Sequence, residues 1–394
     1  MQWKTALAAA ALLLSSAAGA QSRGVSDSEI RLGLITDLSG PIANYGKESR
    51  NGATLAAEEI NARGGIHGRK VRVLVEDSGY EPRRAVLAAQ KLVTQDGVFA
   101  IVGQLGTAPN MATLPFLIQN KVFNFMPQSA VREMYDPPSP YKVALAPSYY
   151  RSAAITMDWF LKQKPYQRIG VLYQDDDYGR ETLEGAQDYL KTKKMDFVEK
   201  VSYKRGATDF SSQMAKLKAA NCDLVLNVST LREYVASVGE ARKIGFNPVF
   251  VGTGANYSQQ VPLLGGKALD GVYGSAFITL PYGDDPNPAV ARWVAAYKKR
   301  FNEDPGLYSM FSYYAMTTFA LIADKTGRNL TPESFNAAME ASPLPADALG
   351  NPAFAVSKAS RLSNARIRIT RVAGDKWVNE SDYLELPKQV STEK

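Results

Sequence analysis

Apolar residues between positions 30 and 77 follow two different spacings, and the rest of the chain repeats this organisation. The β-branched run IRLGLIT, residues 30–36, predicts one strand, and KVRVLVED, residues 70–77, predicts another. Between them, residues 48–64 carry apolar side chains at helical spacing and end at a pair of glycines. A block of this length is typical of a crossover between parallel strands. Because both strands are apolar without clean alternation, we expect a sheet buried on both faces.

The loop after the first strand, DLSGPIANYG at residues 37–46, is a candidate binding loop, because ligands of open parallel sheets bind beyond the carboxyl ends of the strands. The same alternation then runs through two successive series. The first predicts strands at 98–103 and 121–126, helices at 81–95 and 111–119, a proline-rich loop at 127–140 and an extended segment at 141–148. The second begins at Tyr149 and predicts helices at 150–163, 180–193, 208–220 and 231–245, with strands at 168–174, 197–203, 222–229 and 248–253.

After a further apolar run at 271–278, the pattern changes. Long helical patterns occupy residues 287–302 and 308–327 with no strand between them, and we expect them to cover the first lobe. The tail has two β-rich runs, residues 365–374 and 375–386, joined by a turn. The whole pattern predicts an α/β protein with two lobes of similar architecture.

The first twenty residues have the composition of an export signal. Lys4 is followed by the apolar run ALAAAALLL, and small residues end at Ala20, so we expect cleavage after Ala20 and a product in an exported compartment. No cysteine follows the apolar run, so a lipid anchor is not expected. Basic residues (46) exceed acidic ones (39), but they are dispersed, which argues against nucleic-acid binding.

Reactive residues are few. The single cysteine, Cys222, excludes an internal disulfide, and its place in the run CDLVLNVS predicts a small buried residue rather than a nucleophile. The single histidine, His67, lies in a turn, which leaves no triad and no multi-histidine metal site. The run Asp175–Asp177 could hold a cation, although such runs are more often solvated loops. We therefore expect no catalytic residue, no metal and no cofactor.

Uncharged hydrogen-bonding and aromatic residues gather instead at the predicted strand ends. Thr107 precedes a helix, where backbone N–H groups can bind an anion with up to about 2 kcal/mol, or where its side chain can cap the helix. We expect both roles. The other candidates in these loops are Ser39, Asn44, Tyr45, Gln104, Gln128, Ser129, Tyr178, Thr230, Asn256 and Tyr257.

Four motifs give the chain a resemblance to a known family. LSGPIANYGKESRNGATLAAEEINARGGIHGRKV, VGQLGT, LYQDDDYGRE and GDKW together resemble the periplasmic leucine/isoleucine/valine-binding proteins of ABC importers, which are type I periplasmic substrate-binding proteins. The resemblance implies two Rossmann-like lobes with parallel-type sheets, joined by a hinge of three strands that closes the lobes on a ligand. It implies crossings near Ala146, Phe277 and Ser360. The expected lobes are then residues 27–146 with 278–360, and residues 147–277 with 361–388.

The resemblance also implies roles for residues in the cleft. The family's carboxylate-binding hydroxyl falls on Thr107, its backbone donors fall on Gln128, Ser129 and Ala130, and its aromatic residues fall on Tyr45, Tyr178 and Tyr308. The acid that holds the ligand's α-ammonium is replaced by Gly254 in VGTGAN. We therefore expect a small carboxylate without an α-ammonium, such as a benzoate derivative, because an unpaired buried ammonium costs several kcal/mol.

Three functional classes remain open from the sequence. The first is the receptor of an importer, which we expect to be a monomer that works with an inner-membrane permease. Its ligand is an aromatic acid. If an acid from 175–177 reaches the ligand's amine, the ligand is instead a branched-chain or other amino acid. The second is a periplasmic ligand sensor that docks on a membrane signalling protein. The third, an exported enzyme, lacks a visible base, nucleophile or metal cluster.

Overall fold

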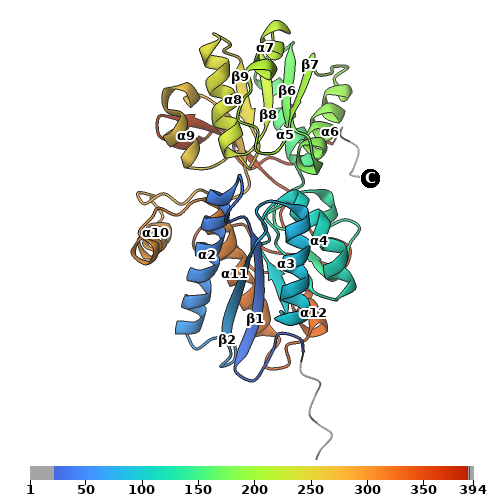
Figure 1. The fold of residues 1–394 in the computed structure, drawn as a ribbon, viewed down its shortest axis with the longest axis vertical. Helices are drawn as coiled ribbons and strands as arrows, with labels where there is room; N and C mark the ends of the chain where they lie inside the picture. The colour runs from blue at the N-terminus through green and yellow to red at the C-terminus, as the bar shows by residue number, and fades with distance from the viewer. Residues whose placement is uncertain (1–21, 389, 391–394) are drawn as a thin grey trace, which may run out of the picture.

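The structure is a computed structural model that describes residues 22–388 and 390. The expected export signal and its cleavage point lie outside the described residues. The described chain forms two α/β lobes, each built on its own sheet, which lie one above the other in Figure 1. Within the described ranges, no helix is long and apolar enough to span a membrane.

Lobe 1, the lower part of Figure 1, contains a five-stranded parallel sheet of order β2-β1-β3-β4-β5. Its strands are β1 (Glu29–Thr36), β2 (Lys70–Asp77), β3 (Ala100–Val102), β4 (Phe123–Phe125) and β5 (Lys142–Val143). Its helices are α2 (Ala43–Ala62), α3 (Pro82–Gln90) with η1 (Lys91–Gln95), α4 (Thr107–Gln119), α10 (Pro288–Phe301), α11 (Leu307–Lys325) and α12 (Pro332–Ala341). The loop 127–140 holds one 3₁₀ turn, η2 (Arg132–Met134).

Lobe 2 contains a seven-stranded sheet of order β12-β11-β10-β9-β8-β6-β7, in which β11 and β12 are antiparallel to their neighbours. Its strands are β6 (Ile169–Gln174), β7 (Glu199–Tyr203), β8 (Leu224–Val228), β9 (Val249–Gly252), β10 (Tyr273–Ala276), β11 (Arg368–Ala373) and β12 (Lys376–Asn379). Its helices are α5 (Tyr149–Gln163), α6 (Asp177–Thr192), α7 (Ser211–Ala219), α8 (Leu231–Lys243) and α9 (Gln260–Gly265), with η3 (Gly266–Leu269). The predicted pair of β-rich runs at the tail is thereby confirmed.

Both faces of the parallel sheet of lobe 1 are buried, as the apolar strands predict. In β1, Leu32 and Leu34 pack in the cluster that includes α2 and α11, whereas Ile35 packs in the cluster of α3 and α4. The aromatic centre of lobe 1 joins distant parts of the chain, because Phe335 of α12 contacts Phe123 and Phe125 of β4 at ring distances of 5.1 and 5.8 Å. The late helices therefore complete the first lobe.

The chain passes between the lobes three times: between β5 and α5, between β10 and α10, and between α12 and β11. We call these three segments the connectors. The first and third run side by side, because Ala144 and Leu362 form a parallel bridge in which Ala144 N–H donates to Arg361 O at 2.9 Å. The connectors therefore bring residues from distant parts of the chain together between the two lobes.

The helix that follows the first strand of each lobe packs directly on the end of that strand. Gly46 of α2 lies so close to Asp37 that a Cβ at this position would be 1.6 Å from the Asp37 carbonyl oxygen. Gly179 of α6 has the equivalent relation to Gln174, at 1.8 Å. Only a residue without a side chain allows this approach. The two glycines therefore set how near each helix N-terminus lies to the end of its sheet.

Two local predictions are wrong. The helix expected from residue 48 begins at Ala43, because the Asp37 carboxylate accepts hydrogen bonds from Ser39, Gly40 and Ile42 N–H and turns the chain early. The candidate loop is therefore shorter, and Tyr45 belongs to a helix. The helix expected at 208–220 begins three residues late, at Ser211, because Asp209 accepts a hydrogen bond from Ser211 N–H.

Cys222 is 6% exposed and lies against β6, where a Cβ on Gly170 would be 2.6 Å from its sulfur. Burial raises the pKa of the Cys222 thiol to about 11. The prediction of a small buried residue is confirmed.

Candidate ligand-binding site

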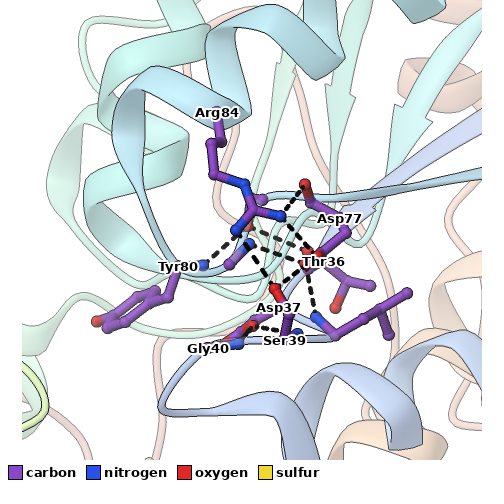
Figure 2. A network of polar contacts seen from close by, with 10 residues as sticks. Thr36, Asp37, Ser39, Gly40, Asp77, Tyr80 and Arg84 are labelled. Carbon is purple, nitrogen blue, oxygen red and sulfur yellow. Dashed lines mark hydrogen bonds and ion pairs between the residues drawn. The ribbon is translucent and has the colours of Figure 1, made fainter.

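The ends of β1 and β2 are closed by a polar network and are not open to a ligand. Figure 2 shows Asp77 at its centre, where its carboxylate accepts from Ser39 Oγ at 2.6 Å and from Arg84 at 2.7 Å. Partial burial alone would raise the pKa of Asp77, but these bonds and those from Leu38 and Gly79 N–H lower it to about 2. Most of the predicted loop 37–46 is thus a structural turn.

A cavity lies instead at the N-terminus of α4, between the two lobes. We call it the helix-end cavity; its volume is about 310 Å³, part of it open to solvent. Thr107 is the first residue of α4, and the preceding Gly106, with φ of 96°, offers no side chain to cap the helix. The cavity is lined by Ile42, Tyr45, Tyr80, Leu105, Gly106, Thr107, Gln128, Tyr149, Tyr178, Thr230, Ala255 and Tyr308, none of which is charged.

Hydroxyl groups converge on Thr107. Its Oγ1 accepts from Ser129 Oγ at 3.1 Å and lies 3.1 Å from the Tyr149 hydroxyl. In the part of the chain that the structure describes, the backbone N–H groups of Thr107 and Ser129 donate no hydrogen bond. Buried N–H groups of this kind, at the positive end of a helix, are suited to an anion.

Gln128 is not the free backbone donor that the resemblance implies. Its N–H donates to Gln104 O at 2.8 Å, because the two segments form a bridge between Leu105 and Gln128. Its side chain is held on both sides, accepting from Ser49 Oγ at 2.5 Å and donating to Ser312 Oγ at 2.7 Å. The Gln128 side chain is therefore fixed in place at the edge of the cavity.

A second cavity adjoins the first on the side of the connectors. We call it the hinge-side cavity; it encloses about 730 Å³, part of it open to solvent. Gln128, Tyr149, Ala255 and Tyr308 line both cavities. The other wall residues come from both lobes and the connectors: Ser129, Ala130, Ala146, Pro147, Ser152, Ala153, Thr156, Thr182, Leu226, Gly252, Thr253, Gly254, Ser275, Ala276, Phe277, Leu307, Phe311 and Ile367.

The lobes touch across the cleft in this structure. Tyr45 of lobe 1 donates from its hydroxyl to Ala255 O of lobe 2 at 2.7 Å, while its ring stacks on Tyr308 at 4.2 Å. On the other edge of the cleft, Arg132 of lobe 1 contacts Glu184 of α6 at 2.7 Å. The cleft is therefore enclosed by direct interlobe bonds at both edges.

A further contact between the lobes involves a buried carboxyl group. Glu48 of α2 is 8% exposed and accepts from Gln260 of lobe 2 at 3.3 Å and from Tyr308 N–H at 3.2 Å. Burial raises the pKa of Glu48 to about 8; the two hydrogen bonds offset this only partly, and the nearby Glu303 adds to it. At neutral pH the group is largely protonated.

The stability of the protein should therefore depend on pH through Glu48. Between about pH 4.5 and pH 8 the native protein holds a proton that the unfolded chain has released, so the free energy of unfolding falls as the pH rises. Glu48→Gln lacks this titrating group, so its Tm should fall less than that of the wild type between pH 6 and pH 8.5. The difference should be a few degrees, since about 1 kcal/mol shifts Tm by about 2–4 °C. Thermal unfolding checks this, with exposed Glu58→Gln as control. Parallel curves for Glu48→Gln and the wild type would contradict it.

Eight of the eleven predicted site residues line one or both cavities: Tyr45, Thr107, Gln128, Ser129, Ala130, Tyr178, Thr230 and Tyr308. The structure places the other three elsewhere. Gln104 is fully buried and bonds Thr113, and Tyr257 packs against Trp377 at a ring distance of 5.5 Å. Asn256 holds its own loop together, donating to Ser229 O and accepting from Thr253 N–H.

Several wall residues escaped sequence analysis. Tyr80 follows β2 in a turn with φ of 61°, and its hydroxyl accepts from Gln174 of lobe 2 at 3.1 Å. Tyr149 begins α5, and Ala255 and Phe277 contribute a carbonyl and a ring. An aromatic residue at the first position of a helix, just after a strand end, was the available signal for Tyr149.

The acids near the cleft are bound to other groups. Asp175 pairs with Arg180 at 2.8 Å and Lys204 at 2.6 Å, and Asp176 caps α6. Glu233 is 2% exposed and accepts from the Thr230 hydroxyl. Among the residues that the structure describes, no group of three or more histidine, cysteine or acidic side chains could hold a metal.

Gly254 stands where a side chain would fit. A Cβ at this position would be 3.7 Å from Ser275 O and 3.9 Å from the Phe277 ring, which is ordinary contact. The hinge-side cavity thus lacks an acid here although it has space for one.

Two lobes, three connectors and an uncharged interlobe cleft with free N–H groups at a helix end define a two-lobed binding protein that encloses a small molecule. Residues 29–376 match the model of the family described as periplasmic binding protein. The chain belongs to this family, among the relatives of the leucine/isoleucine/valine-binding proteins.

The relatives support this placement. The Leu/Ile/Val-binding protein homolog 7 of Brucella abortus (strain 2308) is 27% identical over 323 residues, which cover 77% of this chain and 78% of the relative. A fatty acid ABC transporter substrate-binding protein from Thermomonospora curvata has the same fold, with a TM-score of 0.82, 23% identity, and coverage of 95% of this chain and 96% of the other. A solute binding protein from Rhodopseudomonas palustris BisB5, in complex with 3,4-dihydroxy benzoic acid, has a TM-score of 0.80, 23% identity, and coverage of 92% and 99%.

Proposed function

We propose that this protein is the periplasmic receptor of an ABC importer of the branched-chain amino acid type, and that it captures a small carboxylate without an α-ammonium, such as a benzoate derivative. It binds its ligand without turnover and delivers it to an inner-membrane permease. The observation that carries the proposal is the cleft itself, whose wall residues bear no charge while the uncapped start of α4 offers free N–H groups.

The carboxylate end is supported by the geometry around Thr107. An anion there meets the free N–H groups of Thr107 and Ser129 and the positive end of α4. The Thr107 side chain is 2% exposed and is oriented by Ser129 and Tyr149. Charge-assisted hydrogen bonds in such a dry site are stronger than those between neutral groups.

The rest of the cleft favours an uncharged, planar group. No acid lines either cavity, so an ammonium would be buried without a partner at a cost of several kcal/mol. Tyr45, Tyr80, Tyr178 and Tyr308 present rings to the helix-end cavity, on which an aromatic ligand can stack. The Rhodopseudomonas protein of the same fold, with its dihydroxybenzoic acid, supports this ligand class.

A receptor for amino acids is the second candidate. The Brucella relatives carry the names of leucine/isoleucine/valine-binding proteins, and Glu233 lies directly behind Thr230 at the helix-end cavity. For Glu233 to reach a ligand amine, it must first give up the Thr230 hydroxyl.

Calorimetry with benzoate, 3,4-dihydroxybenzoate, leucine and valine separates the two candidates. We expect heat from the aromatic acids and none from the amino acids. Thr107→Val should weaken binding of the acid by about 1–3 kcal/mol, or about 5- to 150-fold, because it removes a hydrogen bond to a charged group. Thr94→Val, at an exposed helical threonine far from the cleft, is the control. Sub-micromolar leucine binding without heat from the aromatic acids would overturn the proposal.

A further inference from the structure

The hinge-side cavity offers more space than a carboxylate head requires. The head site at Thr107 belongs to the helix-end cavity of about 310 Å³, whereas the adjoining hinge-side cavity encloses about 730 Å³. Tyr149 and Tyr308 line both, so the two cavities adjoin at these residues. The larger free space therefore lies on the hinge side of the head site.

The wall of the hinge-side cavity is suited to an uncharged group. Its apolar surface comes from Ala153 of α5, Leu226 of β8, Phe311 of α11 and the connector residue Phe277. Charged side chains are absent from its lining. A second charge on the ligand would therefore be buried there without a partner, at a cost of several kcal/mol.

Three threonine hydroxyl groups of this wall are already bonded. Thr156 donates to Ser152 O at 2.7 Å and Thr182 donates to Tyr178 O at 2.8 Å, each within its own helix. Thr253 is 2.6 Å from the Tyr178 hydroxyl. A polar ligand group would have to compete for these three hydroxyls, whereas an apolar group leaves their bonds intact and is removed from water.

We propose that the ligand is an elongated monocarboxylate, whose head binds at Thr107 and whose uncharged arylalkyl or alkyl tail fills the hinge-side cavity. The inference rests on the proposed function for the position of the head and adds the length and polarity of the rest. The connectors supply Ala146, Phe277 and Ile367 to the wall, so the far end of the tail contacts the segments that join the lobes.

A series of phenylalkanoates tests the proposal by calorimetry, from benzoate through phenylacetate and 3-phenylpropionate to 5-phenylpentanoate. We expect affinity to rise about fourfold for each added methylene until the cavity is full. Ala153→Leu, which fills the cavity from α5, should weaken the longest acid at least tenfold and change benzoate binding less than twofold. Ala215→Leu, at an exposed position of α7, is the size-matched control and should leave the whole series unchanged.

Gly254→Leu fills the same cavity from the loop after β9, where a Cβ meets only ordinary contacts, and should cause the same selective loss if Ala153→Leu does not fold. Equal affinities along the series, or equal loss of short and long acids in both filled variants, would overturn the tail and leave the carboxylate head standing. Absence of binding by every acid would overturn the proposed function, and the tail with it.

Discussion

Glutamate in place of Gly254 should reverse the charge preference of the cleft. We expect Gly254→Glu to weaken binding of carboxylates at least about 100-fold, because a like charge enclosed beside the ligand costs several kcal/mol. The same variant should bind amino acids that the wild type rejects, since the new carboxylate can pair with an ammonium. The backbone at Gly254 accepts a side chain, as the Cβ distances of 3.7 and 3.9 Å show.

Gly254→Gln separates charge from size in this experiment. It has the shape of glutamate without its charge, so it should retain most carboxylate binding and gain no amino acid binding. Titration of benzoate and leucine into both variants gives the comparison. Equal loss of benzoate binding in both would show that space, and not charge, decides the ligand at this position.

A methyl group on Gly46 should destabilise lobe 1 by at least about 3 kcal/mol, at or above the upper end of what overpacking usually costs. The added Cβ would lie 1.6 Å from Asp37 O, so α2 must move away from β1. That movement also displaces Tyr45, which crosses to Ala255 of lobe 2. Gly46→Ala should therefore lower both the stability of the protein and its affinity for ligand.

Gly239→Ala is the matched control for Gly46→Ala. Gly239 lies inside α8, and a Cβ there meets nothing within 4 Å. Alanine should therefore stabilise this helix by about 0.5–1 kcal/mol. Urea unfolding of the two variants should give changes of opposite sign. If Gly46→Ala leaves the urea midpoint unchanged, the close approach of α2 to β1 has no energetic importance.

The two lobes could be predicted because strands and helices differ in the spacing of their apolar residues, which is visible within each short segment of the chain. Runs such as IRLGLIT and LVLNV are apolar on both faces, and the helices between them keep helical spacing. The start of α2 could not be predicted, because it depends on three N–H groups that turn towards the side chain of Asp37. The late start of α7 has the same cause, since it depends on a hydrogen bond from Ser211 N–H to the side chain of Asp209.

The site could be predicted only in part, and the division has a physical cause. Thr107, Ser129 and Tyr178 lie where strands end, and strand ends of a parallel sheet meet at one edge. Asn256 and Gln104 lie at such ends too, but their amides are used up by partners that only the fold brings near. Phe277 and Ile367 reach the cavity through the connectors, which no local pattern marks.

The burial of Cys222 also makes the protein convenient to label. Its thiol is 6% exposed and has a pKa of about 11, so very little reactive thiolate is present in neutral buffer. Because it is the single cysteine of the chain, a second one introduced at the cleft edge can carry a fluorescent dye selectively. The native sequence is therefore a ready starting point for an optical sensor of its own ligand.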